Sequence, residues 1–386
     1  MTDWREVALG DVIELKRGYD LPKRSRVDGP YPIVSSSGPS GWHHEAKVRG
    51  PGVVTGRYGT LGEVFYVRED FWPLNTSLYV RDFKGNDPRF VSILLDSMGL
   101  AQHDGAAAVP GLNRNQLHTV PVRVPSPASQ RRIAAVVEAI DDLIENNRRR
   151  VAVLEEMARA IYREWFVHFR YPGHEHLPLV DSPLGPIPDG WAVENLFDVA
   201  EVGFGFSFKS KQFADSGPFP VVRIRDIPPG VTKTFSQEVA PDRYRVLDGD
   251  VLIGMDGDFH LRQWTGGEAW LNQRVARLRP RNGMSARHLM LAVDGPIKDW
   301  NAAITGTTVA HLGKRHLEQI HVTVPSASIL ESASALFDDL ASQARSLTQQ
   351  ARTMALTRDL LLPKLVTGQI DVSSLDLDAP TGSATG

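Results

Sequence analysis

The sequence predicts an α+β protein built from two duplicated α/β domains, each followed by a long helix, with the two helices pairing as a coiled coil. Two observations predict this fold class. Apolar residues recur at alternating intervals of four and three through residues 126–168, which is the spacing of a helix that packs along a partner helix. The same spacing returns two hundred residues later, behind segments that also repeat, and this indicates an internal duplication.

The first long helix is predicted over residues 126–168, where Ser126-Pro127 suits a helix start because serine caps free amides and proline fits the first turn. Its seam contains Ile133, Val137, Ile140, Ile144, Asn147, Val151, Leu154, Ala158, Ile161 and Trp165. The seam of the second helix, over residues 326–364, contains Ala333, Phe337, Leu340, Ala344, Leu347, Ala351, Met354, Arg358, Leu361 and Leu365. Arg358 interrupts this seam, and Leu365 lies beyond Pro363, where we expect the helix to end or kink. Asn147 either fixes the register of the pair or marks a solvated gap.

Composition sets the broad class. The 386 residues are 42% apolar, enough for two or three domains with their own cores. Cysteine is absent, so no disulfide or cysteine-ligated zinc is expected, and no apolar run approaches the ~20 residues of a membrane span. We therefore expect a cytoplasmic protein without a membrane partner. The net charge of −3 gives no support of its own to DNA binding, but the acidic excess falls in the connecting segments and leaves the domains slightly basic.

The first domain is predicted over residues 1–125 as an antiparallel sheet with exposed loops and one clear helix, Arg89–Gly99. Its expected strands are Val12–Leu15, Ile33–Val34, Val53–Thr55, Val64–Val67, Leu78–Val80 and Val120–Val124. Residues 169–190 are rich in proline and glycine and are expected to form a linker across the surface. The polar tail, residues 365–386, is expected to be disordered after Ile370.

The second domain, residues 191–325, repeats the plan of the first. The matching segments are 4–12 with 191–199, 31–34 with 219–222, 53–59 with 251–257 and 112–126 with 312–326. The offset between them grows from 187 to 200, so the second domain has gained loop insertions. Framework residues match while polar loop residues differ, which predicts two related scaffolds with two different surfaces.

Three segments resemble a known family. They are Leu154–Val167 at the end of the first helix, Leu184-Gly-Pro-Ile-Pro-Asp-Gly-Trp191 before the second domain, and Leu361–Ile370 near the end of the chain. With the order domain, helix, domain, helix, nearly the whole chain resembles the specificity subunit of a type I restriction–modification system. The resemblance implies two target-recognition domains that each read one half of a split double-stranded DNA sequence. It also implies an antiparallel helix pair.

The resemblance further implies partners. Two methyltransferase subunits would dock on the helices, and restriction subunits with translocase activity would join them, so that S-adenosylmethionine, ATP and Mg bind the partners and this chain needs no cofactor. Val136, Leu143 and Met157 widen the apolar stripe, for contacts with either the recognition domains or these subunits. The alanines at 333, 344 and 351 depart from larger seam residues and thin the pair there. A helix of about 40 residues spans roughly 60 Å, or about 18 base pairs, so the helices would set the half-site spacing.

The predicted DNA-contacting residues are polar or aromatic side chains in loops, many of which hold the same place in both repeats. In the first domain they are Lys16, Arg17, Tyr19, Lys23, Arg24, Arg57, Tyr58, Asn113 and Arg114, with Ser35–Ser37 as further candidates. In the second domain they are Lys209, Lys211, Arg223, Arg225, Asp256, Lys314 and Arg315. Cations and amides suit phosphates and base edges, and the Asp256 carboxylate suits a cytosine amino group. Solvated charged loops and ordinary hairpin turns remain the alternative interpretations.

Catalytic motifs are missing where they would be expected. The sequence has no phosphate-binding P-loop, no G-x-G-x-x-G opening a helix and no adenine-methylation motif of the Asn-Pro-Pro-Tyr type. His43-His44 and the pair His174 and His176 lack a metal-ligand frame, so we expect surface histidines and no metal. The main hypothesis is a DNA-binding subunit with no catalytic residues. The rival hypotheses are a protein-only coiled-coil adaptor and a stand-alone DNA-modifying enzyme.

Overall fold

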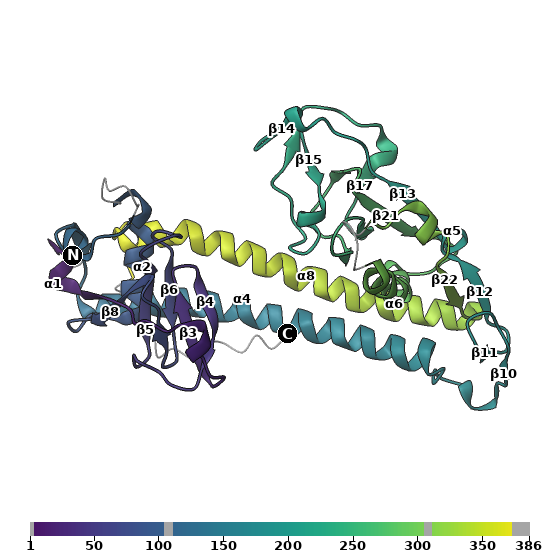
Figure 1. Cartoon of the computed structure of the whole chain (residues 1–386), viewed down its shortest axis with the longest axis horizontal. Coiled ribbons are helices and arrows are strands. Elements are labelled where there is room, and N and C mark those ends of the chain that lie inside the picture. Colours follow the sequence, from purple (N-terminus) through teal and green to yellow (C-terminus); the bar gives the residue numbers. More distant parts are fainter. Residues whose placement is uncertain (1–3, 104–110, 305–310, 373–386) are drawn as a thin grey trace. The chain divides into compact units, whose positions relative to one another are not determined.

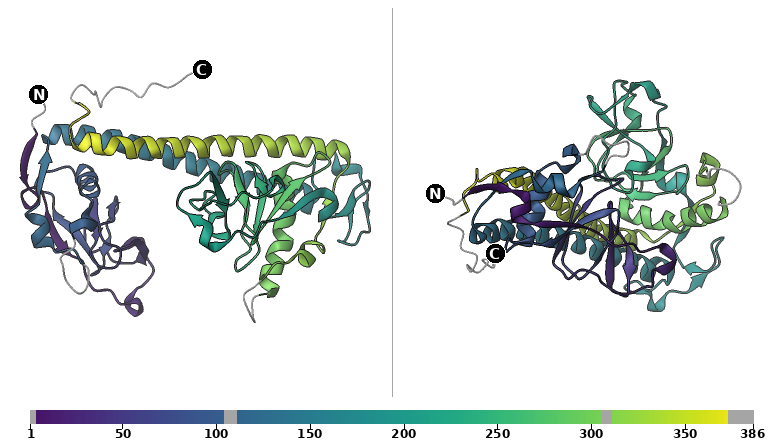
Figure 2. Two further views of the ribbon diagram at one scale, coloured as in Figure 1. Left: turned by 90° about the horizontal axis from the view of Figure 1, so that it is seen from above. Right: turned by 60° about the vertical axis from the view of Figure 1, so that its left-hand side comes forward.

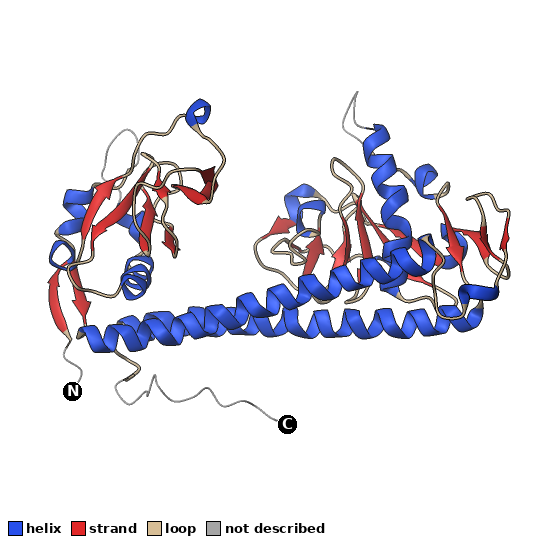
Figure 3. Ribbon diagram, turned by 90° about the horizontal axis from the view of Figure 1, so that it is seen from below, coloured by secondary structure: helices blue, strands red, loops and turns tan. Residues whose placement is uncertain are grey.

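The computed structural model describes residues 4–103, 111–304 and 311–372 and divides into two compact units (Figure 1). The first unit contains residues 1–146 and 350–386, and the second contains residues 147–349. Each unit therefore holds one mixed domain together with part of each long helix. Figure 3 shows helices and strands in both units.

The first domain begins with a short strand and a one-turn helix and ends in a strand that returns to pair with its beginning. Its strands are β1 (Arg5–Ala8), β2 (Glu14–Arg17), β3 (Tyr31–Ser35), β4 (Gly38–His43), β5 (Gly52–Gly56), β6 (Val64–Val67), β7 (Trp72–Pro73), β8 (Ser77–Asp82) and β9 (Pro121–Val124). Its helices are α1 (Leu9–Val12), η1 (Lys23–Ser25), α2 (Pro88–Ser97), η2 (Leu100–His103) and α3 (Arg114–His118).

The main sheet of this domain has the order β2-β8-β5-β6 and is antiparallel throughout, which confirms the predicted antiparallel sheet. A second sheet has the order β4-β3-β7, with β3 and β7 parallel, and β1 pairs with β9. The expected strand Val12–Leu15 was wrong in its start, because Leu9–Val12 forms a helical turn that buries Leu9 and Val12 completely. The strand begins only at Glu14.

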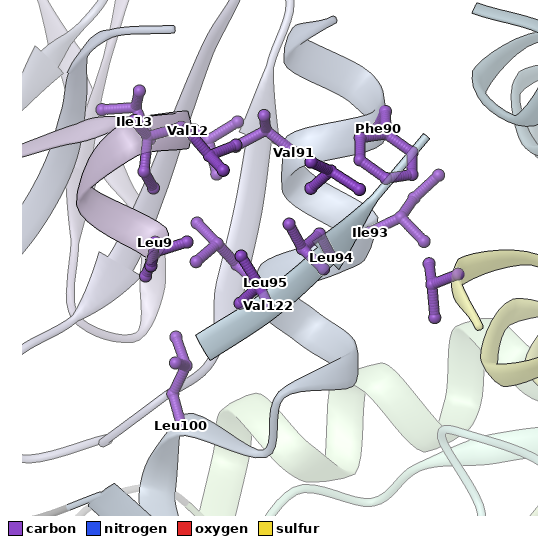
Figure 4. Close-up of a cluster of buried hydrophobic side chains, with 14 of the residues drawn as sticks. Leu9, Val12, Ile13, Phe90, Val91, Ile93, Leu94, Leu95, Leu100 and Val122 are labelled. Atoms are coloured by element: carbon purple, nitrogen blue, oxygen red, sulfur yellow. The ribbon is translucent and has the colours of Figure 1, made fainter. Parts of the chain in front are cut away.

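The core of the first domain forms where α2 covers this framework (Figure 4). Phe90, Val91 and Leu95 of α2 are 0% exposed and pack among residues of α1 and β9. The side chain of Asp87 caps α2 by accepting a hydrogen bond from the amide of Phe90 at 2.9 Å, and Pro88 occupies the first turn. Capping and an apolar face together explain why this segment was predictable as a helix.

The second domain follows the same order of elements. Its strands are β12 (Ala192–Asn195), β13 (Ala200–Phe204), β14 (Phe213–Ala214), β15 (Phe219–Val222), β16 (Phe235–Ser236), β17 (Arg245–Val246), β18 (Val251–Gly254), β19 (Leu261–Gln263), β20 (Ala269–Leu271), β21 (Val275–Pro280) and β22 (His321–Val324). Its helices are α5 (Leu196–Val199), η5 (Ser210–Gln212), η6 (Ile224–Asp226), η7 (Asp242–Tyr244), α6 (Ala286–Ile304) and α7 (Lys314–Leu317).

Strand order confirms the internal duplication. The sheet β13-β21-β18-β19 has the order and the directions of β2-β8-β5-β6, β12 pairs with β22 as β1 pairs with β9, and β15 runs parallel to β20 as β3 does to β7. The other sheet of the second domain has the order β14-β16-β15-β20-β17, compared with β4-β3-β7 in the first domain. The two domains therefore share one backbone plan with different additions.

The two long helices are α4 (Pro127–Tyr162) and α8 (Ala327–Val366), and α4 continues into a π-helical turn, η3 (Arg163–Val167). In the first unit, Ile133 and Val137 of α4 share a core with Leu365 and Val366 of α8, so the start of one helix meets the end of the other. In the second unit, Ala158 near the end of α4 shares a core with seam residues near the start of α8. The pair is therefore antiparallel, as Figure 2 also shows.

Most predicted seam residues lie inside the pair. The buried ones are Ile133, Val137, Ile144, Asn147, Ala158, Ala333, Phe337, Leu340, Ala344, Leu347, Ala351 and Leu365. The half-buried ones are Ile140, Val151, Leu154, Ile161, Trp165, Met354, Arg358 and Leu361. Asn147 is only 5% exposed, which argues against a solvated gap. Arg358 keeps its charge at the seam by donating to Asp141 at 2.7 Å.

Three predictions for the connecting segments need correction. The second helix does not end before Pro363 but runs on to Val366, and Leu365 is 2% exposed in the first core. The segment 169–190 is not only a surface linker, because it forms a ribbon of β10 (Leu179–Val180) with β11 (Ile187–Pro188), besides η4 (His174–His176). Tyr171 in this segment is buried against Trp191. Val372, expected in the disordered tail, is 4% exposed, and residues 373–386 lie outside the described part of the chain.

Hydrogen bonds fasten each domain to a long helix. In the first unit the amide group of Gln130, a fully buried residue of α4, donates to Asn86 at 2.8 Å and accepts from the backbone of Asp87 at 3.0 Å. In the second unit the hydroxyl of Ser334 on α8 accepts from the backbone of Ser285 at 3.1 Å. Because buried polar groups are costly without partners, these bonds fix how each domain meets its helix.

Candidate nucleic-acid interface

A turn between β7 and β8, residues 73–77, brings two predicted loops of the first domain together. Tyr19, after β2, donates its amide to the carbonyl of Pro73 at 2.8 Å, and Arg57, after β5, donates its amide to the carbonyl of Thr76 at 3.0 Å. Gly18 allows the approach, because a Cβ at this position would lie 2.2 Å from the carbonyl oxygen of Leu74. The two loops therefore lie on either side of one turn.

The start of α3 joins the same group. Leu112 donates its amide to the carbonyl of Arg57 at 3.1 Å, so Asn113 and Arg114 follow directly beside the Arg57-Tyr58 loop. The guanidinium of Arg57 lies 4.6 Å from the ring centre of Tyr58, and Tyr58 is 38% exposed. Asn113 caps α3 by accepting from the amide of Asn115 at 2.9 Å, while Arg114 is exposed. The structure thus assembles four of the predicted contact residues.

The second domain builds the same frame from equivalent backbone groups. The amide of Phe206 donates to Leu271 at 2.8 Å, that of Met255 donates to Arg274 at 3.0 Å, and that of Leu312 donates to Met255 at 2.7 Å. Gly205 repeats the role of Gly18, since its Cβ would lie 1.9 Å from the carbonyl oxygen of Asn272. The frame is therefore defined by main-chain hydrogen bonds that do not depend on the side chains displayed.

The displayed side chains differ between the domains. The hydroxyl of Tyr19 lies 3.0 Å from that of Tyr79, with the ammonium of Lys16 at 5.4 Å from the Tyr19 ring centre. The hydrogen bond with Tyr79 lowers the pKa of Tyr19, assisted by the charge of Lys16, whereas burial raises the pKa of Tyr79. At the equivalent place Phe206 has no hydroxyl and instead packs edge-on against Phe208 and Tyr244. One position is polar and the other is apolar.

Asp256 is engaged by two cationic or polar neighbours. Its carboxylate lies 2.6 Å from Nδ1 of His311 and 3.0 Å from the guanidinium of Arg274, and the side chain is 21% exposed. A contact with a cytosine amino group would have to share this carboxylate with both neighbours. Lys314 and Arg315 follow His311 on α7 and are exposed.

Arg223 and Arg225 lie around a second feature of this domain, a cavity of about 540 Å³ that they line together with Lys233. The guanidinium of Arg223 lies 5.2 Å from the ring centre of Phe213, and Arg225 donates to the hydroxyl of Thr234 at 3.2 Å. Lys209 and Lys211 are exposed on either side of the start of η5. Arg223 and Arg225 thus begin the segment 223–250, which is ten residues longer than its counterpart 35–52, whereas Lys209 and Lys211 lie in the counterpart of the loop after β2.

The remaining candidates of the first domain lie near the end of β2. Lys16 and Arg17 are strand residues rather than loop residues, which corrects their predicted placement, and Arg17 pairs with Asp20 at 3.8 Å. Lys23 and Arg24 are exposed on η1. The further candidates Ser35–Ser37 lie at the end of β3 and in the turn that follows it. The carbonyl oxygen of Ser36 lies close to Gly56, just before Arg57, since a Cβ on this glycine would be 2.7 Å from it.

Three polar residues at this interface were not predicted: Thr76, Lys233 and Arg274. Thr76 and Arg274 occupy the central turn of each frame, and Arg274 is 56% exposed. The signal available was the short polar stretch that separates two apolar strands in both repeats, residues 75–77 and 272–274. Lys233 lies in an insertion, where no repeat partner points to it.

Only some of the histidines expected at the surface are exposed. His43 is 2% exposed, and its Nδ1 lies 3.1 Å from both the amide and the carbonyl of Val27, so the surface prediction was wrong for this residue. Ligand atoms of His43, His44 and Glu45 lie within 4.8 Å of one another. The carboxylate of Glu45 is bonded to Lys47 at 2.6 Å, and that bond lowers its pKa. His174 is half-buried and bonds to the carbonyl of Tyr171.

No helix within residues 4–103, 111–304 and 311–372 is both long and apolar enough to cross a membrane. A model of the family described as the type I restriction modification DNA specificity domain matches residues 1–156 and 188–352. The two matches follow the two structural repeats, each reaching well into the long helix behind its domain. The chain belongs to this family. The resemblance found in the sequence is thereby confirmed.

Two relatives carry the same designation. The specificity subunit of the MjaIX type I restriction enzyme of Methanocaldococcus jannaschii is 26% identical over 294 residues, covering 70% of this chain and 65% of the relative. The specificity subunit of the EcoBI type I restriction enzyme of Escherichia coli is 31% identical over 196 residues, covering 49% of this chain and 41% of the relative. The match thus spans less than two thirds of either relative.

A solved structure supports the fold of this specificity-domain protein. The S subunit of a type I restriction–modification system from M. genitalium superposes with a TM-score of 0.60, covering 95% of this chain and 96% of the other, at 15% identity. At this identity the likeness concerns the fold alone. It agrees with the duplicated domains and the antiparallel helix pair described above.

Proposed function

We propose that this chain is the sequence-specific DNA-binding subunit of a type I restriction–modification complex and that each domain reads one half of a bipartite target. The observation that supports this most directly is the frame that is built twice. Main-chain hydrogen bonds hold the Arg57 loop and the Met255 loop in the same way, yet their side chains differ: Tyr58 is exposed in one loop, whereas in the other Met255 is buried and Asp256 is 21% exposed. Equal scaffolds with unequal side chains suit two different half-sites.

The charge around the frame supports contact with a duplex. Arg17, Lys23, Arg24 and Arg114 are exposed in the first domain, and Lys209, Lys211, Arg225, Lys314 and Arg315 are exposed in the second. Such cations contact phosphates and position a protein on DNA, while base edges carry the sequence information. The helices α4 and α8, of 36 and 40 residues, are proposed to set the number of unread bases between the half-sites.

The helix pair also offers a surface for the methyltransferase subunits. Leu356 and Leu360 lie one turn apart on α8 and are 66% and 72% exposed, so both project from the same face into solvent. Large apolar side chains exposed in pairs mark partner surfaces more often than single ones do. We expect the double change L356Q and L360Q to leave the stability of the chain unchanged but to prevent copurification with the methyltransferase subunit. Leu247→Gln, at a residue 45% exposed in the second domain, is the matched control and should retain the partner.

This proposal assigns the chemistry to the partners. S-adenosylmethionine would bind the methyltransferase subunits, ATP and Mg would bind the restriction subunits, and this chain would itself bind no cofactor. An adenine in each half-site would be flipped out and methylated by the partner. Because the substrate would be chromosomal DNA, the complex would act in the cytoplasm.

Selection from a random DNA library with the chain and its methyltransferase tests the proposal. The expected result is enrichment of two short motifs at a fixed spacing. Exchanging residues 191–326 for the corresponding domain of a relative should change one motif and leave the other. A protein-only adaptor would give no sequence preference, and a change in both motifs would refute reading by separate domains.

A further inference from the structure

A cavity of about 300 Å³ in the second unit is lined by an excess of positive charge. It lies between β19 and α6 of the second domain and adjoining stretches of α4 and α8. Its charged and titratable lining consists of Arg159, Arg262, Arg287, Arg345, His260 and Glu155. Four guanidinium groups therefore face a single carboxylate among the described residues of this cavity.

Arg287 is the unusual member of this group. Its side chain is 8% exposed, and within the part of the chain that the structure describes it has no hydrogen bond and no ion pair. Burial lowers the pKa of Arg287; the charges of Arg159, Arg345 and Arg262 lower it further, and Glu155 opposes them. A buried guanidinium without a partner is costly, so such groups normally meet an anion.

The neighbouring arginines come from separate elements. Arg262 on β19 donates to the carbonyl of Pro228 at 2.5 Å, and Arg159 on α4 pairs with Glu156 at 2.9 Å while it is 44% exposed. Arg345 lies on α8 and is half-buried. Cations from the recognition domain and from both long helices thus converge on one space. An uncharged packing role for these side chains does not explain why four arginines meet there.

We propose that this cavity binds a phosphate group, which would join the second recognition domain to the helix pair. Guanidinium groups from four elements suit a tetrahedral oxyanion with acceptors on all sides, whereas a flat carboxylate is satisfied by one or two arginines. The volume lies at the small end of ligand pockets and suits a single phosphate group with its water. The group would come either from inorganic phosphate or from a phosphate of bound DNA. This inference does not depend on which bases the domains read.

The full chain can be tested with inorganic phosphate. Calorimetric titration and thermal melts in phosphate-free buffer, at matched ionic strength with chloride, should show binding to the wild-type chain. R287M should weaken phosphate binding about tenfold or more, because it removes a charge-assisted hydrogen bond. E155Q should tighten it, since it removes the one carboxylate. R281M, at an exposed arginine of the same domain outside the cavity, is the matched control and should bind like the wild type.

The second test measures DNA binding. If the chain with its methyltransferase subunits binds DNA about tenfold more weakly as R287M than as R281M, on target and non-target duplexes alike, the phosphate comes from DNA. Binding of inorganic phosphate by the wild type but not by R287M assigns the site to the free ion. Equal phosphate effects on wild type and R287M, or no effect in either arm, would overturn the proposal. R345M, at a half-buried arginine, provides the same comparison should R287M not fold.

Discussion

His288 should make the second unit lose stability in mild acid. This residue of α6 is 0% exposed, and neither of its ring nitrogens has a hydrogen-bond partner among the described residues. Its ring lies among aromatic rings, 4.3 Å from that of Phe166 and 5.6 Å from that of Phe337. Burial in this apolar cluster lowers the pKa of His288 to about 4. The imidazole is therefore neutral in the folded chain at neutral pH.

The unfolded chain takes up this proton near the ordinary histidine pKa of about 6.5, and the folded chain does so only near pH 4. Stability is thus complete above pH 6.5 and is lost as the pH falls from 6.5 towards 4, because the unfolded state binds the extra proton in that range. At 1.36 kcal/mol for each pKa unit, the difference corresponds to about 3 kcal/mol. Below pH 4 this histidine removes no further stability.

Urea unfolding of the full chain between pH 4 and pH 8 measures this effect in comparison with His288→Leu. Tryptophan fluorescence follows the unfolding; it includes the signal of Trp191, whose ring lies 5.5 Å from that of Phe166, together with that of the other seven tryptophans. The variant should gain about 3 kcal/mol relative to the wild type between pH 6.5 and pH 4. Parallel pH profiles for wild type and His288→Leu would refute the reasoning.

Three further predictions concern the framework. Asp141→Ala should destabilise the first unit by about 1–2 kcal/mol in urea unfolding, because Asp141 pairs with both Arg89 and Arg358. The control is Asp142→Ala, at a neighbouring residue that is 63% exposed, and it should cost less than about 0.5 kcal/mol. Gly56→Ala should unfold the Arg57 loop and abolish DNA selection, since its Cβ would lie 1.8 Å from the carbonyl oxygen of Thr60. Seven residues added to both α4 and α8 lengthen each helix by about 10 Å and should lengthen the spacer of the methylated target by about three base pairs. An unchanged spacer would show that helix length does not set the distance between the half-sites.

The fold was predictable where a period or a repeat covered many residues. The alternating intervals through Ile133 and Phe337 predicted helices that the structure extends over 36 and 40 residues. A helix end or a kink was expected at Pro363, and the end does not occur, for an energetic reason. A proline inside a helix costs about 3 kcal/mol, but burying Leu365 and Val366 in the first core returns about 1.5–3 kcal/mol for each side chain. The burial of these two side chains thus outweighed the cost of a proline inside the helix.

Elements without a long period were harder to predict. The helix α6 (Ala286–Ile304) contains Gly295 and Pro296 in its middle, and both residues argue against a helix in sequence alone. The buried Tyr171 was missed because the segment around it has the composition of a linker. The arginine cavity joins residues from 151 to 348, so no local pattern connects its members. Contacts between distant segments decided all three features.

The candidate interface illustrates how one duplicated backbone frame can carry two different sets of side chains. The bonds that place its loops run between backbone groups, from Arg57 to Thr76 in one domain and from Met255 to Arg274 in the other. These bonds do not themselves require a particular side chain, although Met255 is also buried and packs in the core of the second domain. The glycines, by contrast, are required, because Gly18 and Gly205 must leave room for a carbonyl oxygen about 2 Å from their missing Cβ. Variation is thus tolerated at exposed residues such as Tyr58 and Arg114 and excluded at the glycines, which is what a domain would need to acquire a new target under the proposed function.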